Sequence, residues 1–366
     1  MEVYLTRARV RNFRNFWVPK ESLVEKMERV FFASGLDKLV EKGSRVGIKL
    51  HMGEPGNVHY MRPIFAWKLV DMLKNKGAEP VIIETSGLGS MPGRTTATKH
   101  LEAARRNGFT EETIGAPIVI VDGEDGLDMI EVDGISVAKG VEELDTLMVL
   151  SHATAHIQAG YAGAIKNIAL GCVAKPGKFR IHHKDKPRIN NDACTDCEDC
   201  IKICPVGAIS GDPLTITEEC IQCGRCTDTC PAGAIIVEFT SAETVSKRTA
   251  ENAAGVAKTL DGQLGYITLL LDVLPHCDCH PHSDTPVIPD IGIVASRDPV
   301  GIDKASIDLI NASPGVLGTE AEAVGAMDIG IDKLTKLNPN TRWSIQLEEA
   351  ERLGLGKMDY KIKEVA

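Results

Sequence analysis

Eight of the eleven cysteines stand in two matching segments near the middle of the chain. Residues 194–209 read CTDCEDCIKICPVGAI and residues 220–235 read CIQCGRCTDTCPAGAI, so each segment contains C-x2-C-x2-C-x3-C-P. Three cysteines spaced in this way let one tight loop present three thiolates to three corners of an iron-sulfur cube, but the fourth cysteine cannot reach the same cube. The pattern therefore predicts two [4Fe-4S] clusters that exchange their fourth ligands.

The exchange assigns four cysteines to each cluster. The first set is Cys194, Cys197, Cys200 and Cys230, and the second is Cys220, Cys223, Cys226 and Cys204. The alternative is structural zinc, but two zinc sites would need neither the second C-x2-C step of each segment nor the Cys-Pro ending. Residues 187–238 resemble bacterial-type two-cluster ferredoxins, and the resemblance implies a pseudo-twofold fold that carries low-potential, one-electron clusters.

A second cluster of reactive side chains lies in residues 275–284, which read PHCDCHPHSD. On an extended segment, Cys277 and Cys279 point both thiols to the same side. A zinc or additional iron ion would accept those two thiolates with imidazoles from His280, His282 and His51. The second interpretation is redox chemistry, in which the cysteines or a bound substrate take electrons from the nearer cluster. The third is a proline-bounded turn without a chemical role.

The elements that must position these groups alternate between strands and helices on both sides of the cysteine repeat. We expect strands over residues 45–51, 79–86, 117–123, 143–156, 266–274 and 290–296, and helices over residues 58–77, 94–108, 240–259 and 300–313. This order predicts an α/β fold, with a mostly parallel sheet and helices on both faces, into which an α+β ferredoxin-like module is inserted. The expected boundaries are 1–186, 187–238 and 239–366, with residues 175–188 as a linker into the module.

Several polar residues follow the expected strands directly. In open parallel sheets, ligands sit beyond the carboxyl ends of the strands, so we expect His51, His152 and His156 to converge there with residues 275–284. The glycine-rich segment 156–172 adds Lys166, which could hold an anionic group. We predict Cys277, Cys279, His152 and Lys166 as catalytic residues. The alternative is that each histidine makes ordinary hydrogen bonds of its own.

Composition limits the partners and the compartment. The formal charge of −10 over 366 residues disfavours a nucleic-acid surface, which needs clustered lysine and arginine. No apolar run approaches the length of a membrane span, and the N-terminus has no hydrophobic signal core. We therefore expect a cytoplasmic protein, in which free cysteines serve metal binding or catalysis rather than disulfides. A soluble electron donor or acceptor protein is the expected partner.

Over nearly its full length, including the two-cluster insert, the sequence resembles the iron-sulfur branch of the domain-of-unknown-function family numbered 362. The resemblance rests on AGYAGAIKNIALGC (159–172), on the Cys-Asp-Cys element at 277–279, on Pro-Asp-Ile-Gly at 289–292 and on the Ser-x-Asp-Pro-Val turn at 296–300. It implies cluster binding but no defined reaction, in keeping with an anaerobic iron-sulfur protein.

Three functions are compatible with these observations. The first is an oxidoreductase whose clusters relay single electrons into a polar cleft, where a small anionic or metal-bound substrate is reduced. The second is an electron-transfer adaptor whose α/β body docks another enzyme and has no chemistry of its own. The third is a hydrolase or isomerase whose iron is purely structural.

Overall fold

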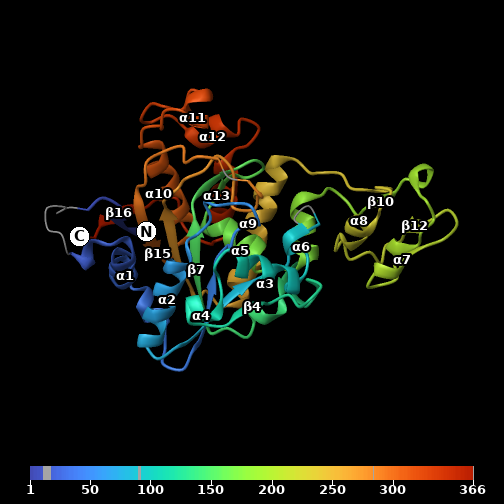
Figure 1. Cartoon of the computed structure of the whole chain (residues 1–366), viewed down its shortest axis with the longest axis horizontal. Coiled ribbons are helices and arrows are strands. Elements are labelled where there is room, and N and C mark those ends of the chain that lie inside the picture. The colour runs from blue at the N-terminus through green and yellow to red at the C-terminus, as the bar shows by residue number, and fades with distance from the viewer. Residues whose placement is uncertain (11–17, 90–91, 283, 366) are drawn as a thin grey trace.

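The computed structural model describes residues 1–10, 18–89, 92–282 and 284–365. An eight-stranded sheet with the order β16-β1-β15-β14-β7-β2-β3-β4 forms the centre of the body (Figure 1). Its strands are β1 (Glu2–Arg7), β2 (Arg45–Lys49), β3 (Glu79–Glu84), β4 (Ile118–Ile120), β7 (Thr146–His152), β14 (Leu264–Leu270), β15 (Gly292–Ser296) and β16 (Lys361–Glu364).

Most strand pairs in this sheet are parallel. The five strands from β14 to β4 run parallel to one another, whereas β15 is antiparallel to both of its neighbours and β16 is parallel to β1. The carboxyl ends of β14, β7, β2, β3 and β4 therefore meet at one edge. The predicted α/β fold with a mostly parallel sheet is confirmed.

Alternate side chains of the strands point into two separate hydrophobic cores, one on each face of the sheet. Ile48 and Met148 face a core shared with α1 (Leu23–Ala33), α2 (Pro63–Asn75), α3 (Ala97–Arg106) and α4 (Glu111–Ile114). Leu147 and Val149 face the opposite core, built with α5 (Ala164–Gly171), α9 (Ala242–Thr259), α10 (Pro299–Asn311) and α13 (Trp343–Arg352). Helices thus cover both faces of the sheet, because its central strands are buried on both sides.

The remaining elements of the body are short. Two hairpins, β5 (Met129–Val132) with β6 (Ile135–Ala138) and β8 (Thr154–His156) with β9 (Gly160–Ala162), extend from the sheet. Single-turn helices are η1 (Pro19–Glu21), η2 (Leu36–Leu39), η3 (Pro92–Arg94) and η4 (Lys139–Val141), and the C-terminal region adds α11 (Glu320–Ala323) and α12 (Lys333–Leu337). The strand expected over residues 143–156 is divided, because the chain leaves β7 and turns into the β8–β9 hairpin.

The interpretation of residues 175–188 as a linker is wrong for its first half, which forms α6 (Lys175–His182). Pro176 stands in the first turn, where a missing N–H costs nothing. Phe179 and Ile181 are buried, and the helix packs against α9. Two of the four lysines that suggested a linker, Lys175 and Lys178, belong to this helix of the body.

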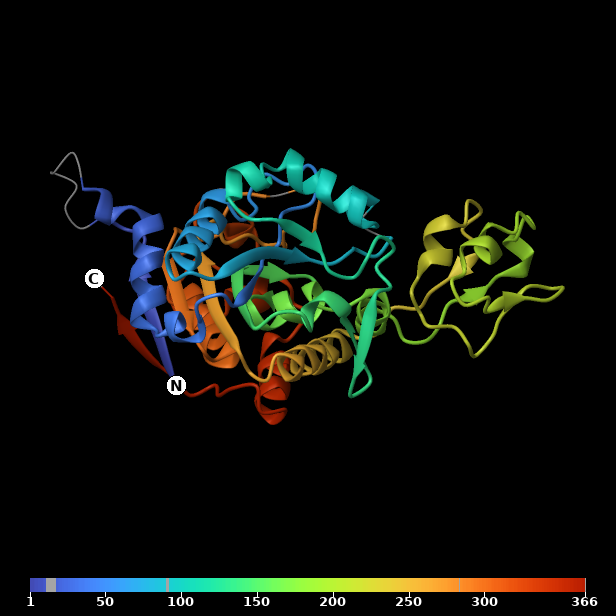
Figure 2. The same ribbon diagram turned by 90° about the horizontal axis from the view of Figure 1, so that it is seen from below.

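Between α6 and α9 the chain forms a segment that stands away from the sheet (Figure 2). It contains β10 (Arg188–Ile189), η5 (Asn191–Ala193), α7 (Asp199–Ile203), β11 (Ile209–Ser210), β12 (Thr215–Ile216), α8 (Arg225–Thr229) and β13 (Ile235–Ile236). Strand β10 pairs with β13, and β11 pairs with β12. We call residues 187–238 the cysteine segment.

The two copies of the cysteine repeat share an unusual backbone. Asp196 and Glu198 have φ values of 51° and 60°, and their counterparts Gln222 and Gly224 have values of 57° and 73°. Left-handed residues are uncommon outside glycine, so their recurrence at matching positions shows that both copies form the same turn.

The cysteine segment also contacts the body. Arg225 on α8 forms a 3.0 Å ion pair with Asp125 of the body. A Cβ placed on Gly224 would lie 3.2 Å from the ring of Phe179, so α6 approaches this turn closely. The ring of Phe179 stacks on the ring of His183 with 4.0 Å between centroids, and the ring of His183 in turn lies 5.1 Å from that of Phe239.

Asp298 provides a test of the body's stability. Its buried carboxylate caps α10 by accepting hydrogen bonds from the amides of Val300 and Gly301, and it also accepts one from Lys357 N at 2.8 Å. We expect Asp298→Ala to lower the free energy of unfolding by about 1–3 kcal/mol, because three buried amides lose their acceptor. Chemical denaturation measures this, and Glu143→Ala, which removes an exposed pair with Arg45, should cost less than about 1 kcal/mol. Equal losses in both variants would contradict the cap.

Candidate functional site

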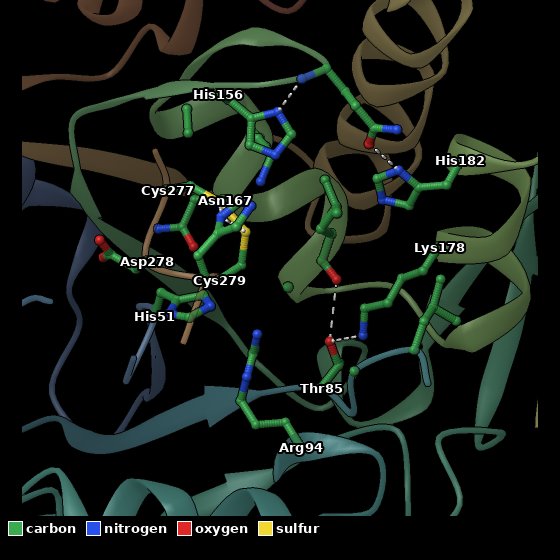
Figure 3. Close-up of a pocket in the computed structure, with 18 of the residues that line it drawn as sticks. His51, Thr85, Arg94, His156, Asn167, Lys178, His182, Cys277, Asp278 and Cys279 are labelled. Carbon is green, nitrogen blue, oxygen red and sulfur yellow. Dashed lines mark hydrogen bonds between the residues drawn. A yellow bond between two sulfur atoms is a disulfide. The ribbon is translucent and has the colours of Figure 1, made fainter. Parts of the chain in front are cut away.

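A cavity of about 530 Å³ lies at the carboxyl edge of the parallel strands (Figure 3). Lys49 and His51 reach it from the end of β2, Glu84 to Ser86 from β3, and Ser151 and His152 from β7. Helix α5 contributes Lys166 and Asn167, and α6 contributes Lys178 and His182. The cysteine segment completes the wall with Gly224, Thr227 and Asp228. The cavity therefore lies between the body and that segment.

The structure brings most of the residues singled out in the sequence to this cavity. Its lining includes His51, His152, His156, Lys166, Cys277, Cys279 and His280. His282 is exposed and does not line the cavity. The lining also contains Lys49, Arg94, Lys178 and His182, which sequence reasoning missed. Two features of the sequence could have identified some of them. Lys49 lies inside the apolar strand GIKL, and Lys178 and His182 are spaced to lie on the same side of a helix.

Two of the cationic side chains in the wall are paired with buried carboxylates. Lys49 contacts the carboxylate of Glu84 and donates to the side-chain oxygen of Asn167 at 2.7 Å. Burial is the largest single effect and raises the pKa of Glu84, but the charge and hydrogen bond of Lys49, together with His100 and Lys178, outweigh it, and the pKa lies below its ordinary value. Arg94 pairs with the buried Glu54 at 2.5 Å. These pairs form a rigid floor.

His152 is held as an imidazolium. Its Nδ1 lies 2.9 Å and 3.1 Å from the carboxylate oxygens of Asp278, and its Nε2 lies 2.7 Å from the carbonyl oxygen of Leu271. Since both nitrogens face acceptors, both carry protons. Burial lowers the pKa of His152, but the charge and hydrogen bonds of Asp278 overcome that effect and raise it to about 9.

His51 and His156 are neutral and share one tautomer. His51 Nδ1 accepts from the amide of Gly53 at 3.0 Å, and His156 Nδ1 accepts from the amides of Gln158 and Ala159 at 3.2 Å and 3.0 Å. Burial, followed by nearby cations, holds both pKa values well below the ordinary value. A neutral imidazole whose Nδ1 accepts must carry its proton on Nε2. The Nε2–H of His51 has no hydrogen-bond partner among the described residues.

Lys166 differs from the other cations of the cavity. It makes no ion pair or hydrogen bond with any residue that the structure describes, and burial lowers its pKa to about 8. Lys178, by contrast, donates to Thr85 Oγ1 at 2.6 Å and to the carbonyl oxygen of Ser86 at 2.5 Å. Lys166 therefore has its donors available for a ligand, and it stays largely protonated at pH 7.

Cys277 and Cys279 are joined by a disulfide in the cavity wall. A ring nitrogen of His156 and both sulfur atoms lie within 4.8 Å of one another, so these three atoms could also bind a metal ion. The two arrangements exclude each other, because a metal needs two free thiolates. The described state fits the disulfide better, since the Nε2 of His156 bears a proton and offers no lone pair.

Two smaller cavities in the cysteine segment are lined by four cysteines each. One contains Cys194, Cys197, Cys200 and Cys230, and the other contains Cys204, Cys220, Cys223 and Cys226. Three cysteines in each cavity come from one copy of the repeat and the fourth from the other copy. The amides of Ala208 and Ala234 each donate to the sulfur of the fourth cysteine, Cys204 and Cys230, at 3.2 Å.

Gly224 connects the two kinds of cavity. It lines the cavity that contains Cys204 and Cys223, and it also lines the large cavity of the body. This contact could not be predicted from the sequence, because Gly224 comes close to the body only where it packs against Phe179 of the folded α6.

A parallel α/β body with a polar cavity at its strand ends, joined to a cysteine-rich segment, defines the class of protein. The chain belongs to the family described as Domain of unknown function (DUF362), which matches residues 46–308. No curated protein matches the sequence. None of the helices within the described residues combines the length and apolar character that a membrane span requires.

Two solved structures show a distant likeness. The lactate racemase apoprotein from Thermoanaerobacterium thermosaccharolyticum is 16% identical over 74% of this chain and 50% of that chain, with a TM-score of 0.39. A structural-genomics protein from Thermotoga maritima is 14% identical over 67% of this chain and 50% of that chain, with a TM-score of 0.31. The chain thus spans about half the length of these proteins, and similarity this low carries no argument about activity.

The ion pair between His152 and Asp278 predicts a pH dependence of stability. A histidine whose folded pKa is raised stabilises the fold fully below its unfolded pKa, and this stabilisation is lost as the pH rises through about 9. Its full size is at most about 3 kcal/mol. We expect the unfolding free energy of the native protein to fall by up to about this amount between about pH 6.5 and pH 10, relative to the variant His152→Gln/Asp278→Asn.

Denaturant titrations at several pH values measure the difference, and His59→Gln, a histidine outside the cavity, should follow the native curve. Parallel curves for the native protein and the double variant would show that His152 is not protonated in the fold.

Proposed function

We propose that the protein is an iron-sulfur oxidoreductase. In this proposal, two [4Fe-4S] clusters in the cysteine segment relay single electrons from a soluble partner protein to the large cavity, where a small anionic substrate is reduced. The observation that carries the proposal is the position of Gly224, which lines both a four-cysteine cavity and the large cavity. Only one turn of the chain separates the expected cluster from the expected substrate.

The cysteines fit the proposed clusters by number, chemistry and grouping. Each four-cysteine cavity supplies four sulfur ligands, as a cubane cluster needs. Zinc sites typically use C-x2-C pairs, whereas each copy of the repeat contains four cysteines in series. Backbone amides already donate to Cys204 and Cys230, and such hydrogen bonds stabilise the extra negative charge of thiolate ligands. When bound, such clusters supply one-electron transfer at low potential.

The cavity favours an anionic substrate of modest size. Lys166 and the Nε2–H of His51 are donors that no described residue uses, and burial strengthens their attraction for an anion. Leu170, Phe179 and Ile157 add apolar wall, so an anionic group attached to a short apolar part matches the lining.

An adaptor without chemistry of its own explains these features less well. A docking protein has no need for a cavity of about 530 Å³ that is lined by a disulfide and by buried, unsatisfied donors. Buried polar groups without partners cost stability, so their retention in a cavity points to a ligand.

Iron analysis of anaerobically purified protein tests the clusters and their exchanged ligands. We expect about eight irons per chain, and about four in Cys204→Ser/Cys223→Ser, because both cysteines serve the same cluster. The matched variant Cys204→Ser/Cys197→Ser changes the same number of cysteines but touches both clusters, so it should retain almost no iron. The reverse order would show that each copy of the repeat holds its own cluster, and stoichiometric zinc would remove the electron relay.

Anion binding tests the role proposed for Lys166. We expect acetate, oxalate, phosphate or sulfate to raise the midpoint of thermal unfolding of the native protein, because a ligand of the folded state stabilises it. Lys166→Gln should weaken the best of these anions about tenfold or more, through loss of a charged donor. Lys202→Gln, which removes an exposed lysine of α7, should not. Equal weakening in both variants would contradict a specific anion site.

A further inference from the structure

We propose that Cys277 and Cys279 form a reversible disulfide that collects two electrons in the cavity, as the step between one-electron delivery and substrate reduction. The inference rests on the proposed function, because it takes its electrons from the reduced iron-sulfur clusters of the cysteine segment. It starts from one juxtaposition: the disulfide and the turn at Gly224 line the same cavity.

The Cys-Asp-Cys element is held so that its sulfurs face the cavity. Asp278, between the two cysteines, bonds His152, and its carbonyl oxygen accepts from the amide of Glu54 at 3.1 Å. Asn57 donates to the carbonyl oxygen of His280 at 3.2 Å. These contacts fix the loop on both sides of the disulfide, so that opening the bond need not release the chain.

The two sulfurs differ in access. Cys277 is buried, with 5% of its surface exposed, whereas Cys279 is half-buried and lines the same cavity. A dithiol with one accessible and one protected sulfur can react with a substrate through the first and close again through the second. Cys279 is therefore the sulfur assigned to contact the substrate.

Two imidazoles stand beside the sulfurs. His280 Nδ1 lies 3.7 Å from each sulfur, and the ring of His156 lies on the same group, within 4.8 Å (Figure 3). The backbone amides that bond His156 Nδ1 keep the proton on Nε2, so this ring offers a donor to a sulfur that gains negative charge. An N–H donor stabilises a thiolate and thereby favours opening of the disulfide.

The step balances without another reagent. The disulfide takes up two electrons, one from each reduced cluster, the S–S bond breaks, and two protons from solvent in the cavity complete two thiols. Reduction of a substrate by two electrons then returns the thiols to the disulfide. A carrier of this kind couples one-electron delivery to a two-electron reaction of the substrate.

A reductive titration with a one-electron reductant, titanium(III) citrate, tests the inference on the iron-loaded protein. The native protein should consume about four electrons per chain, about one for each cluster and about two for the disulfide. Cys277→Ser and, separately, Cys279→Ser should each consume about two, with the iron content unchanged. Cys172→Ala, which changes a buried cysteine outside all three cavities, should behave as the native protein.

Thiol labelling of the native protein gives a second readout that needs no variant. Tryptic peptide 259–297 contains Cys277 and Cys279 as its only cysteines. Iodoacetamide added together with denaturant should leave both unlabelled in the oxidised protein and label both after the clusters are reduced.

A disulfide that stays closed while the clusters are reduced would overturn the inference and leave the proposed function intact. Labelling of both cysteines before reduction, or a ninth metal ion lost on His156→Phe, would also overturn it in favour of a metal site. If the purified protein contained no iron, the proposed function itself would be contradicted, and metal analysis alone would show this.

Discussion

Burying charge at the carboxyl edge of a parallel sheet is costly unless each charge finds a partner, and this constraint shapes the whole cavity. Lys49 is satisfied by Glu84, Arg94 by Glu54, and His152 by Asp278. Breaking any one of these pairs would leave an uncompensated charge in a low-dielectric site, at a cost of several kcal/mol. The pairs therefore fix the wall, and the donors that remain outside them, on Lys166 and His51, are the ones that can respond to a ligand.

The same constraint joins the cavity to the Cys-Asp-Cys element. The sequence suggested an extended segment here, but residues 277–280 form a turn, in which the amide of His280 donates to the carbonyl oxygen of Cys277 at 3.1 Å. In this turn the carboxylate of Asp278 contacts His152, while Cys277 and Cys279 are joined by the disulfide. The ion pair thus anchors the loop and keeps His152 protonated, and both sulfurs line the cavity. The strand ends supply the platform, but the orientation of the sulfurs depends on Asp278.

The cysteine spacing and the alternation of strands and helices could be interpreted from the sequence because they are local patterns. The parallel order of the central strands followed from them, and so did the expectation that His51, His152 and the Cys-Asp-Cys element lie near one edge. Contacts between distant segments could not be predicted. Strand β1 pairs with β15 across nearly the full chain. Helix α6 was interpreted as a linker because the cavity that Lys178 lines exists only after folding.

The electrostatics of the cavity also favour one direction for the proposed electron flow. Reduction adds negative charge to the reacting group, whether a sulfur of the disulfide or the substrate, and preorganised donors stabilise that charge as it develops. Lys166 and the Nε2–H groups of His51 and His156 are such donors, and backbone amides hold the two imidazole rings in place. The thiolate-rich clusters proposed on the other side of Gly224 would repel an electron that resides on them and release it toward this positive end. A cavity built to oxidise an anion would instead need acceptors facing the reacting atoms, and the carboxylates of Glu84 and Asp278 are already turned to their own cations.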